Sequence, residues 1–520
     1  MNGSGPATAS GRDRLTPLFF VALAALVTLP GLGRSSLWWD ECHSVRTAQA
    51  LLGRAPGQIL GGMARGLSPY FVLLAPVVRA ATSEVALRLP SVLAALGLVA
   101  VAAGIGRDLG GRALAWRAGL ALAVSPFVVW HAREVRWYTL AWLLAALSLR
   151  QGLRAARGAG GRSLVASTVW GLSAAMVFSP AIVLLPPILI AAFGVSRSPG
   201  TGAVVVDAAA RRRRFLVAGG VLLIVLVAGI WLWQVLLGPA LHGGAAGLGF
   251  ANLGELSPAA VGYTAVAMAT GYTLGPGPIE WHAQPPVMPS SGEAVLMGGG
   301  VLILAALWLR GLDVVRRTVS VRAAALLLAL SVIPVMALAA AAVWTGHRFA
   351  PRHAGVIALP VLLLAAAGTL PSGRRAAWPA VAGALLLVLQ AVSLGQLHLS
   401  PRYLREQVRD AADYVDRVAH PDDLVLVFGG IDLPWRWYDH GGVPSRIVYP
   451  DDPATWSPGS MPAVLEGHPR VVVVRGEIMF DPLEKPLYDA VTSMGRRESA
   501  MRFPGLEVEV LSLVTQGESP

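Results

Sequence analysis

Two adjacent carboxylates, Asp40 and Glu41, directly follow the tryptophans Trp38 and Trp39 near the start of the chain. Tryptophan favours the headgroup level of a membrane, so the two acids are expected close to the membrane surface, where a lipid phosphate would also lie. A partly desolvated carboxylate there has a raised pKa and can act as a general base. The competing interpretation makes the tryptophans belt residues and the acids caps of the following helix.

A second group of ionisable residues interrupts two apolar stretches further along the chain. Its polar members are His131, Arg133, Glu134, Arg136 and Tyr138. Charges at membrane depth cost roughly a few kcal/mol each unless they pair or face a wet cavity. Two arginines with one glutamate leave a spare guanidinium for an anion, although Glu134 could merely neutralise Arg133 or Arg136 in a tight loop.

Further basic residues are expected on the same face. Arg348, Arg352 and His353 lie in the connection between two later spans, and Arg88 stands at the start of an early one. Each arginine suits a phosphate, and each could instead snorkel toward the headgroups with no further role. Arg88 by itself does not indicate a phosphate site.

No metal-binding pattern accompanies these residues. His43, Glu280 and His282 could be grouped with the acidic pair, but no spacing typical of a metal site relates them. The single cysteine, Cys42, excludes an internal disulfide and is interpreted as a small packed side chain. The sequence therefore requires no cofactor, and it leaves a divalent cation open.

The composition indicates that these residues belong to a membrane protein. The 520 residues are 55% hydrophobic and only 14% charged, with a positive mean hydropathy, and this is more apolar surface than a soluble fold can bury. The net charge of +12 comes almost wholly from arginine, a bias typical of a GC-rich bacterial genome. Because the arginines form short clusters between apolar runs, they indicate membrane topology rather than nucleic-acid binding.

About eleven apolar runs are long enough to cross a membrane. They lie near 17–33, 86–105, 113–130, 135–150, 164–178, 180–195, 215–237, 294–310, 323–344, 353–370 and 377–397. With a cytoplasmic N-terminus, the arginine clusters fall inside, and the connection from about 238 to 292, which has no Lys or Arg, falls outside. The first run lacks a following cleavage site, so we interpret it as a retained anchor. The short apolar segment 68–81 is placed in the interface, within a first outer loop at about 34–85.

After residue 398 the pattern becomes that of a soluble domain. Apolar runs at 424–428, 446–449 and 471–474 alternate with helix-like segments at 403–418 and 482–494. This alternation predicts a small α/β domain at 399–520, and an odd number of spans makes it extracytoplasmic. Gly429-Gly430 is interpreted as a strand-ending turn rather than a phosphate loop. The expected fold is thus a polytopic α-helical membrane domain, 1–398, followed by this domain.

In the order of these elements the chain resembles the GT-C membrane glycosyltransferases, specifically the superfamily of protein O-mannosyltransferases and aminoarabinose transferases. The matching pieces are Asp40-Glu41 after the first span, Leu87-Arg88-Leu89-Pro90-Ser91 at the second, and the 131–138 loop in place of a "QEARxY"-like loop. Pro351-Arg352-His353 resembles a late "PRY" segment, with histidine in place of tyrosine. Leu67-Ser68-Pro69 stands where the family has His-Pro-Pro.

The resemblance implies an enzyme that moves a monosaccharide, mannosyl or arabinosyl, from a polyprenyl-phosphate donor to an acceptor hydroxyl on the outer side of the membrane, with inversion. The acceptor would be a glycan, lipid or protein, and the site a bacterial plasma membrane. Asp40 becomes the general base and Glu41 its assistant. The candidates for holding the donor phosphate are Arg88, Arg133, Arg136 and Arg352. Candidate substrate contacts are His43, Glu134, Tyr138, Arg348 and His353.

A transporter or flippase of lipid-linked sugars is the competing function, since charges inside a membrane can also line a transport pathway. Such proteins tend to consist of repeated halves, and the sequence shows no internal repeat.

Overall fold

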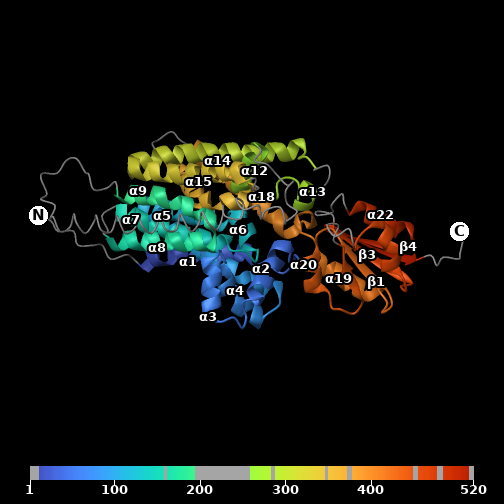
Figure 1. Ribbon diagram of the computed structural model, residues 1–520. Helices are drawn as coiled ribbons and strands as arrows, with labels where there is room; N and C mark the ends of the chain where they lie inside the picture. The colour runs from blue at the N-terminus through green and yellow to red at the C-terminus, as the bar shows by residue number, and fades with distance from the viewer. Residues whose placement is uncertain are drawn as a thin grey trace, which may run out of the picture.

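A bundle of helices and a smaller domain built on a β-sheet lie end to end (Figure 1). The computed structural model describes residues 11–156, 161–193, 258–282, 287–345, 349–371, 377–448, 455–476 and 484–513. The longer bundle helices are α1 (Gly11–Thr28), α5 (Glu84–Ala123), α7 (Tyr138–Ala156), α8 (Gly161–Val177), α9 (Leu185–Phe193), α12 (Pro258–Thr270), α14 (Ser291–Thr318), α15 (Val321–Thr345), α17 (Ala358–Gly368) and α18 (Trp378–Leu399). Shorter ones are α2 (Trp39–Gln49), α3 (Pro56–Ala64), α4 (Pro69–Ala80), α6 (Pro126–Ala132), η1 (Ser179–Leu184), α13 (Pro278–His282), α16 (Pro351–Ala354) and η4 (Gly355–Ile357).

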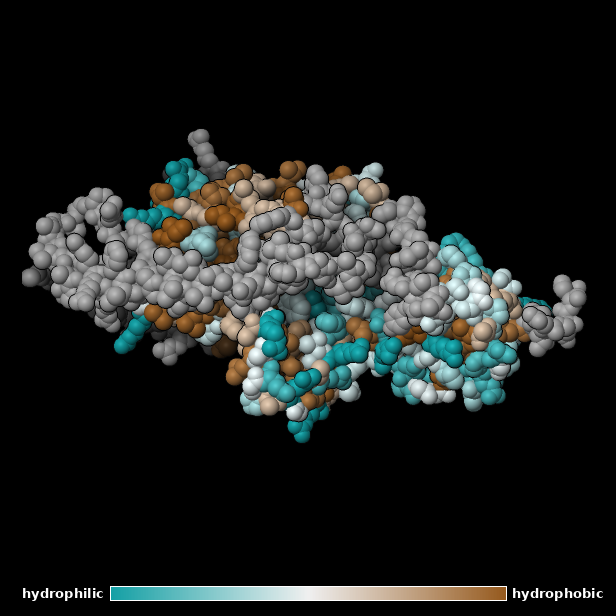
Figure 2. All heavy atoms as spheres, viewed as in Figure 1, coloured by the Kyte–Doolittle hydropathy of each residue, from teal (hydrophilic) through white to brown (hydrophobic). Residues whose placement is uncertain are grey.

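Five helices in the described ranges are long and apolar enough to cross a membrane. They are Glu84–Ala123, Ser291–Thr318, Val321–Val343, Pro351–Gly368 and Trp378–Leu399. Large apolar side chains stand exposed on them, among them Leu302 on α14 and Met336 on α15. Figure 2 shows hydrophobic surface gathered over the bundle and hydrophilic surface over the sheet domain. Exposed apolar surface of this extent needs lipid as its solvent, so the chain is a multi-pass membrane protein, as its composition predicted.

The long helix α5 contains the predicted span 86–105 and the first part of the predicted span 113–130, because the chain doubles back inside it. Gly111 has a φ of +67°, and Gly110 is also non-helical. Beyond this turn the two halves pack so closely that a Cβ on Gly106 would lie 2.8 Å from the carbonyl oxygen of Leu114. Glycine alone tolerates both the left-handed backbone and this approach. The span predicted at 215–237 lies outside the described residues, so the count of eleven stays a prediction.

The segment predicted at 68–81 forms the helix α4, which has 12 residues. Ser68 caps it, since its Oγ accepts a hydrogen bond from the Tyr70 N–H and donates one to the Val177 carbonyl. Buried side chains such as Phe71 and Leu74 point into the core, and α4 packs mainly on α2. The short helix is therefore confirmed, while its place in the membrane interface stays a prediction.

The C-terminal domain is a five-stranded sheet in the order β2-β1-β3-β5-β4. Its strands are β1 (Leu424–Phe428), β2 (Ser445–Ile447), β3 (Arg470–Gly476), β4 (Gly495–Phe503) and β5 (Leu506–Leu513). Its helices are α19 (Val408–Val418), α20 (Asp432–Tyr438), α21 (Met461–Leu465) and α22 (Lys485–Ser493). The parallel neighbours β2 and β3 flank β1, with Leu426 paired to Val473 in the β1–β3 register. A fully buried apolar run such as β1 is what a central parallel strand requires.

All three predicted strands are present, and the predicted helix at 403–418 begins only at Val408. The antiparallel pair β4 and β5 was not predicted. Most residues of β4 are exposed, so its sequence, rich in arginine, lacks the alternation that marks a half-buried strand. Gly429 and Gly430, both with positive φ, follow β1 as the predicted turn. The Gly429 N–H donates to the buried carboxylate of Glu484, 3.0 Å away.

The C-terminal domain docks on the end of the bundle that carries the acidic pair. The Trp39 Nε1–H donates to Asp432 Oδ1 at 3.1 Å. The hydroxyl of Tyr438 accepts from the Leu37 N–H at 2.7 Å and donates to Glu84 at 2.9 Å. Through these contacts α20 lies against α2, and the domain shares one face of the protein with Asp40.

Candidate active site

At the start of α2 the adjacent carboxylates of Asp40 and Glu41 lie in different environments. Trp38 is the N-cap, with extended backbone angles, and the helix begins at Trp39. Successive side chains on a helix point about 100° apart. The Glu41 side chain is 1% exposed, whereas that of Asp40 is 17% exposed. Of the two carboxylates, Asp40 is therefore the more accessible one.

Glu41 forms a closed ion pair with Arg88. The Arg88 Nε and Nη2 donate to the two carboxylate oxygens at 2.9 and 2.8 Å. The Val135 N–H adds a bond of 2.8 Å, and the Trp38 N–H approaches to 3.4 Å in the manner of a capping box. The capping interpretation thus holds for Glu41, whose lone pairs are occupied by protein donors.

Arg88 has no donor left for a ligand either. Its remaining N–H groups point at the carbonyl oxygens of Leu32, Ser35 and Ser36, at 2.6 to 3.1 Å, and its side chain is 3% exposed. It neither snorkels nor faces a cavity. Neither Glu41 nor Arg88 therefore offers a free polar atom to a ligand in this geometry, and the pair fixes the start of α2 to the start of α5. The catalytic role predicted for Glu41 and the phosphate-binding role predicted for Arg88 stay predictions.

The carboxylate of Asp40 faces two arginines without a hydrogen bond to either guanidinium. Its Oδ2 lies 3.7 Å from Arg136 Nη2 and 3.6 Å from Arg352 Nη1. Among the described residues, this oxygen and the Nε atoms of both arginines are buried and lack a hydrogen-bond partner. Buried polar groups are rarely left unpaired, and such exceptions call for a functional explanation. The three side chains form an incomplete polar site that an additional group would complete.

Arg136 is held in place by its neighbours. Its guanidinium stacks on the Trp137 ring, with Cζ 3.9 Å from the ring centroid. Its Nη1 donates to the Asp40 carbonyl at 3.1 Å, and its Nη2 reaches the Tyr138 hydroxyl at 3.4 Å. A stacked guanidinium loses little further freedom when it binds an anion. The fold thus brings the predicted residues Asp40, Arg136, Tyr138 and Arg352 together.

The other predicted contacts lie around this cluster. Arg133 is turned away, and its donors are taken by the carbonyl oxygens of Thr28, Pro30 and Gly31. His43 is exposed one turn along α2, stacked on Trp39. Its desolvation and the positive charge of Arg136 lower the pKa of this histidine.

His353 lies on α16 beside Arg352, with its ring centroid 6.4 Å from that of Phe178. Arg348 lies outside the described residues. Cys42 is buried and free, as a packed side chain would be.

Glu134 pairs with a residue that sequence reasoning missed. Its carboxylate forms an ion pair with Arg405 and lies 2.9 Å from His131 Nδ1, while His131 Nε2 lies 3.0 Å from the Tyr272 hydroxyl. Burial alone would raise the pKa of Glu134, but the charge of Arg405 and the His131 contact outweigh it and lower the pKa to about 2. Glu134 is therefore a buried carboxylate that stays ionised.

Arg405 belongs to the segment that leads from α18 into the C-terminal domain. Its guanidinium stacks on the ring of Trp38 at 3.9 Å, and Trp38 precedes Asp40 by two residues in the sequence. The signal in the sequence is a group of three arginines, 402, 405 and 409, that follows the last predicted span. The sequence pattern places this segment in the soluble domain, so it predicts no link with the loops that carry Asp40 and Glu134.

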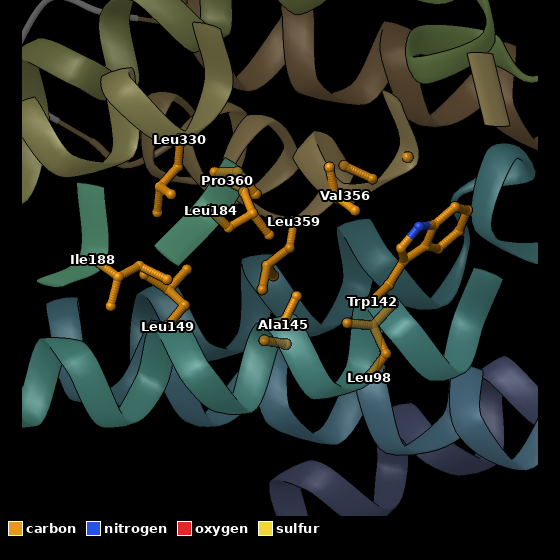
Figure 3. Close-up of a pocket in the computed structure, with 13 residues that line it drawn as sticks. Leu98, Trp142, Ala145, Leu149, Leu184, Ile188, Leu330, Val356, Leu359 and Pro360 are labelled. Atoms are coloured by element: carbon orange, nitrogen blue, oxygen red, sulfur yellow. The ribbon is translucent and has the colours of Figure 1, made fainter. Parts of the chain in front are cut away.

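A small apolar pocket lies deeper in the bundle, between α5, α7, η1, α15 and α17 (Figure 3). Its volume is about 20 Å³, roughly that of one water molecule. Trp142 lines the pocket and also packs edge-on against His131. The pocket therefore adjoins the aromatic side chains behind the polar cluster formed by Asp40, Arg136 and Arg352. Its lining holds no ionisable residue, so we assign it no chemistry.

Comparisons with known proteins agree with the predicted class at the level of fold. No family model and no curated protein matches the chain. ArnT from Cupriavidus metallidurans, in a crystal structure with bound undecaprenyl phosphate, has a TM-score of 0.53 at 14% identity, over 97% of this chain and 99% of ArnT. The apo state of ArnT also gives 0.53, at 15% identity, over 97% and 98% of the two chains.

A weaker likeness, with a TM-score of 0.46 at 15% identity, is to the arabinofuranosyltransferase AftD from Mycobacteria, over 98% of this chain and 40% of AftD. The fold assignment rests on ArnT. The chain has the fold of the GT-C membrane glycosyltransferases.

Proposed function

We propose that this protein is a glycosyltransferase that moves a monosaccharide from a polyprenyl-phosphate donor to an acceptor hydroxyl on the outer side of the membrane. The observation that carries the proposal is Asp40 facing Arg136 and Arg352, with unpaired buried atoms on all three. A group that can take a proton thus stands beside two that can hold a phosphate. The undecaprenyl phosphate bound to ArnT, which shares the fold, supports the class of donor.

The transfer is a single displacement at the anomeric carbon. The acceptor hydroxyl gives its proton to the Asp40 carboxylate as its oxygen attacks that carbon from the face opposite the phosphate. The bond from the anomeric carbon to the phosphate oxygen breaks, and its electron pair leaves with the polyprenyl phosphate. The configuration of the sugar inverts. Transfer to a positioned base contributes typically about 10² to 10⁴ in rate.

The two arginines stabilise the leaving phosphate as its negative charge grows. Their distances to Asp40, 3.6 and 3.7 Å, exceed a hydrogen bond, so phosphate oxygens can take up the free donors. A guanidinium that turns to the phosphate also weakens its hold on Asp40, which makes the carboxylate a stronger proton acceptor. Donor binding and activation of the base are thus coupled through Arg136 and Arg352.

The sugar is mannosyl or arabinosyl and the acceptor a glycan, lipid or protein, by analogy with the superfamily that the sequence resembles. The site belongs to a bacterial plasma membrane, with the C-terminal domain extracytoplasmic. Docking of that domain beside Asp40 supports one common face for both. His43, Glu134, Tyr138 and His353 surround the cluster as contacts for sugar or acceptor, and Arg348 extends this set from outside the described residues.

A donor panel tests the proposal. Purified protein in lipid is incubated with radiolabelled polyprenyl-phosphate sugars and membrane acceptors, and the labelled product is identified. The matched pair of variants is Asp40→Asn and Asp413→Asn, since Asp413 is an exposed carboxylate of α19. We expect transfer by the parent and by Asp413→Asn only, with undecaprenyl phosphate binding retained in both variants.

Unchanged turnover in Asp40→Asn would remove Asp40 as the base. Movement of labelled lipid across liposomes, without any new glycosidic bond, would instead favour the transporter alternative.

A further inference from the structure

The segment between α18 and α19 is fixed at both ends against the membrane domain. Arg402 forms ion pairs of 2.7 Å with Glu280 and with Glu293. The Tyr403 hydroxyl donates to the Gly275 carbonyl at 3.0 Å. Further on, Arg409 pairs with Glu84 at 2.7 Å. The chain between these anchors therefore has little freedom, and the position of Arg405 is set by the docking of the C-terminal domain.

Arg405 lies at the edge of the polar cluster, between two aromatic rings. Its Cζ lies 3.9 Å from the centroid of Trp38 and 5.2 Å from that of Trp130, and its side chain is 16% exposed. Its Nη2 donates to Glu134. None of the hydrogen bonds formed among the described residues uses its Nε or Nη1, so the N–H groups on these two nitrogens can still donate to a ligand. The same Trp38 ring lies 5.9 Å from Arg352 Cζ, which places both arginines around one indole.

The charges of the cluster do not balance within the part of the chain that the structure describes. The arginines Arg136, Arg352 and Arg405 face the carboxylates Asp40 and Glu134. The neighbouring pair of Glu41 and Arg88 is neutral and closed, and Arg133 points to backbone carbonyls. One positive charge is left over in a largely buried site. Such a charge is costly unless a partner of opposite sign joins it.

We infer that Arg405 supplies the excess positive charge that binds the phosphate group of a polyprenyl phosphate, both in the sugar donor and in the lipid phosphate that leaves. Without Arg405 the two remaining arginines would be neutralised by Asp40 and Glu134, and the empty site would attract no anion. The inference rests on the proposed function, which it deepens by making the C-terminal segment part of the donor site. It also explains why a buried glutamate is tolerated beside a phosphate site: Arg405 neutralises Glu134 while keeping donors for the ligand.

Binding of undecaprenyl phosphate to the full-length protein in nanodiscs tests this. Arg405→Gln should weaken binding by about 10- to 100-fold, the value of a charge-assisted contact. Arg405→Lys keeps the charge but loses the planar fork and the stacking on Trp38, so it should recover only part of the loss and bind more tightly than Arg405→Gln. The double variant Glu134→Gln with Arg405→Gln removes one charge of each sign, restores the excess, and should bind more tightly than Arg405→Gln alone. Arg417→Gln is the control, because Arg417 is exposed on α19 and lies outside the cluster.

Equal binding by the parent and Arg405→Gln would overturn the inference, as would a double variant that binds no better than Arg405→Gln. Arg136→Gln and Arg352→Gln separate this from the proposed function. If they weaken binding while Arg405→Gln does not, only the role of Arg405 falls. If Arg136→Gln and Arg352→Gln also leave undecaprenyl phosphate binding unchanged, both the role of Arg405 and the proposed donor site are wrong.

Discussion

Glu41 and Arg88 meet through two parallel N–H···O bonds of 2.8 and 2.9 Å in a site where neither side chain is more than 3% exposed. The pair joins α2 to the start of α5, and the Val135 N–H bound to Glu41 adds the loop after α6. Because this ion pair fixes the backbone at Glu41, it also fixes the position of the preceding residue, Asp40. The two neighbouring carboxylates thus differ in their surroundings: Glu41 is closed in an ion pair, whereas Asp40 is partly exposed and faces Arg136 and Arg352.

Removing one partner of this pair should destabilise the protein strongly. Glu41→Gln or Arg88→Gln leaves an uncompensated charge in a buried site, which typically costs about 3 to 5 kcal/mol. We expect each single variant to lower Tm and the yield of folded protein in detergent. The double variant Glu41→Gln with Arg88→Gln leaves no bare charge, so it should be more stable than the worse single variant. A double variant that is worse than both would contradict this account of the pair.

Replacement of Arg352 should affect donor use rather than stability. Its side chain is about one-third exposed, and its contacts to described residues include a long ion pair with Asp40 and a distant approach to the Trp38 ring, so little native structure depends on it. Arg352→Gln should lower kcat/KM for the donor by about 10- to 100-fold, the value of a hydrogen bond to a charged group. Arg352→Lys should recover part of the loss, since it restores the charge without the planar fork.

The control for this variant is Arg112→Gln, at the exposed turn within α5. Steady-state kinetics with varied donor concentration give the result. A lowered Tm together with unchanged kcat/KM would assign Arg352 to stability instead.

The sequence predicted the features that depend on local pattern. Apolar runs marked the helices because lipid must cover them. Short apolar runs also marked β1, β2 and β3, of which β1 and β3 are largely buried in the sheet domain. The order of Asp40, the 131–138 loop and Pro351-Arg352-His353 then pointed to one face, and the structure brings Asp40, Arg136 and Arg352 within ion-pair distance.

Pairing between distant residues was not predictable in this way. Nothing local distinguishes Asp40 from Glu41, and the difference arises only because Arg88 folds back onto the second of them. Arg405 was missed since its role depends on how the C-terminal segment returns to Trp38. Strand β4 was not predicted because its residues are mostly exposed and show no hydrophobic alternation.

Tyr438 should control how firmly the C-terminal domain is docked. Its hydroxyl bridges the Leu37 N–H and the Glu84 carboxylate, so Tyr438→Phe leaves both without this partner, at a cost of about 1 to 3 kcal/mol. Amide hydrogen exchange in α2 and α20 should accelerate. Tyr414→Phe is the matched control, because the Tyr414 hydroxyl takes part in none of the hydrogen bonds among the described residues. Equal exchange in the two variants would show that docking does not depend on this bridge.

Glu134 should make the stability of the site dependent on pH in the acid range. Its pKa in the folded protein is lowered to about 2, against 4.5 for an ordinary glutamate. A carboxyl group whose pKa falls on folding contributes stability that is present above about pH 4.5 and is lost as the pH falls toward 2. A difference of this size corresponds to about 3 kcal/mol. The parent should therefore lose more Tm between pH 6 and pH 3 than Glu134→Gln does, although the variant starts from a lower Tm because Arg405 and His131 lose their partner. Parallel Tm profiles for the two proteins would mean that Glu134 carries no proton-linked stability, and that Arg405 is held by its aromatic neighbours rather than by this carboxylate.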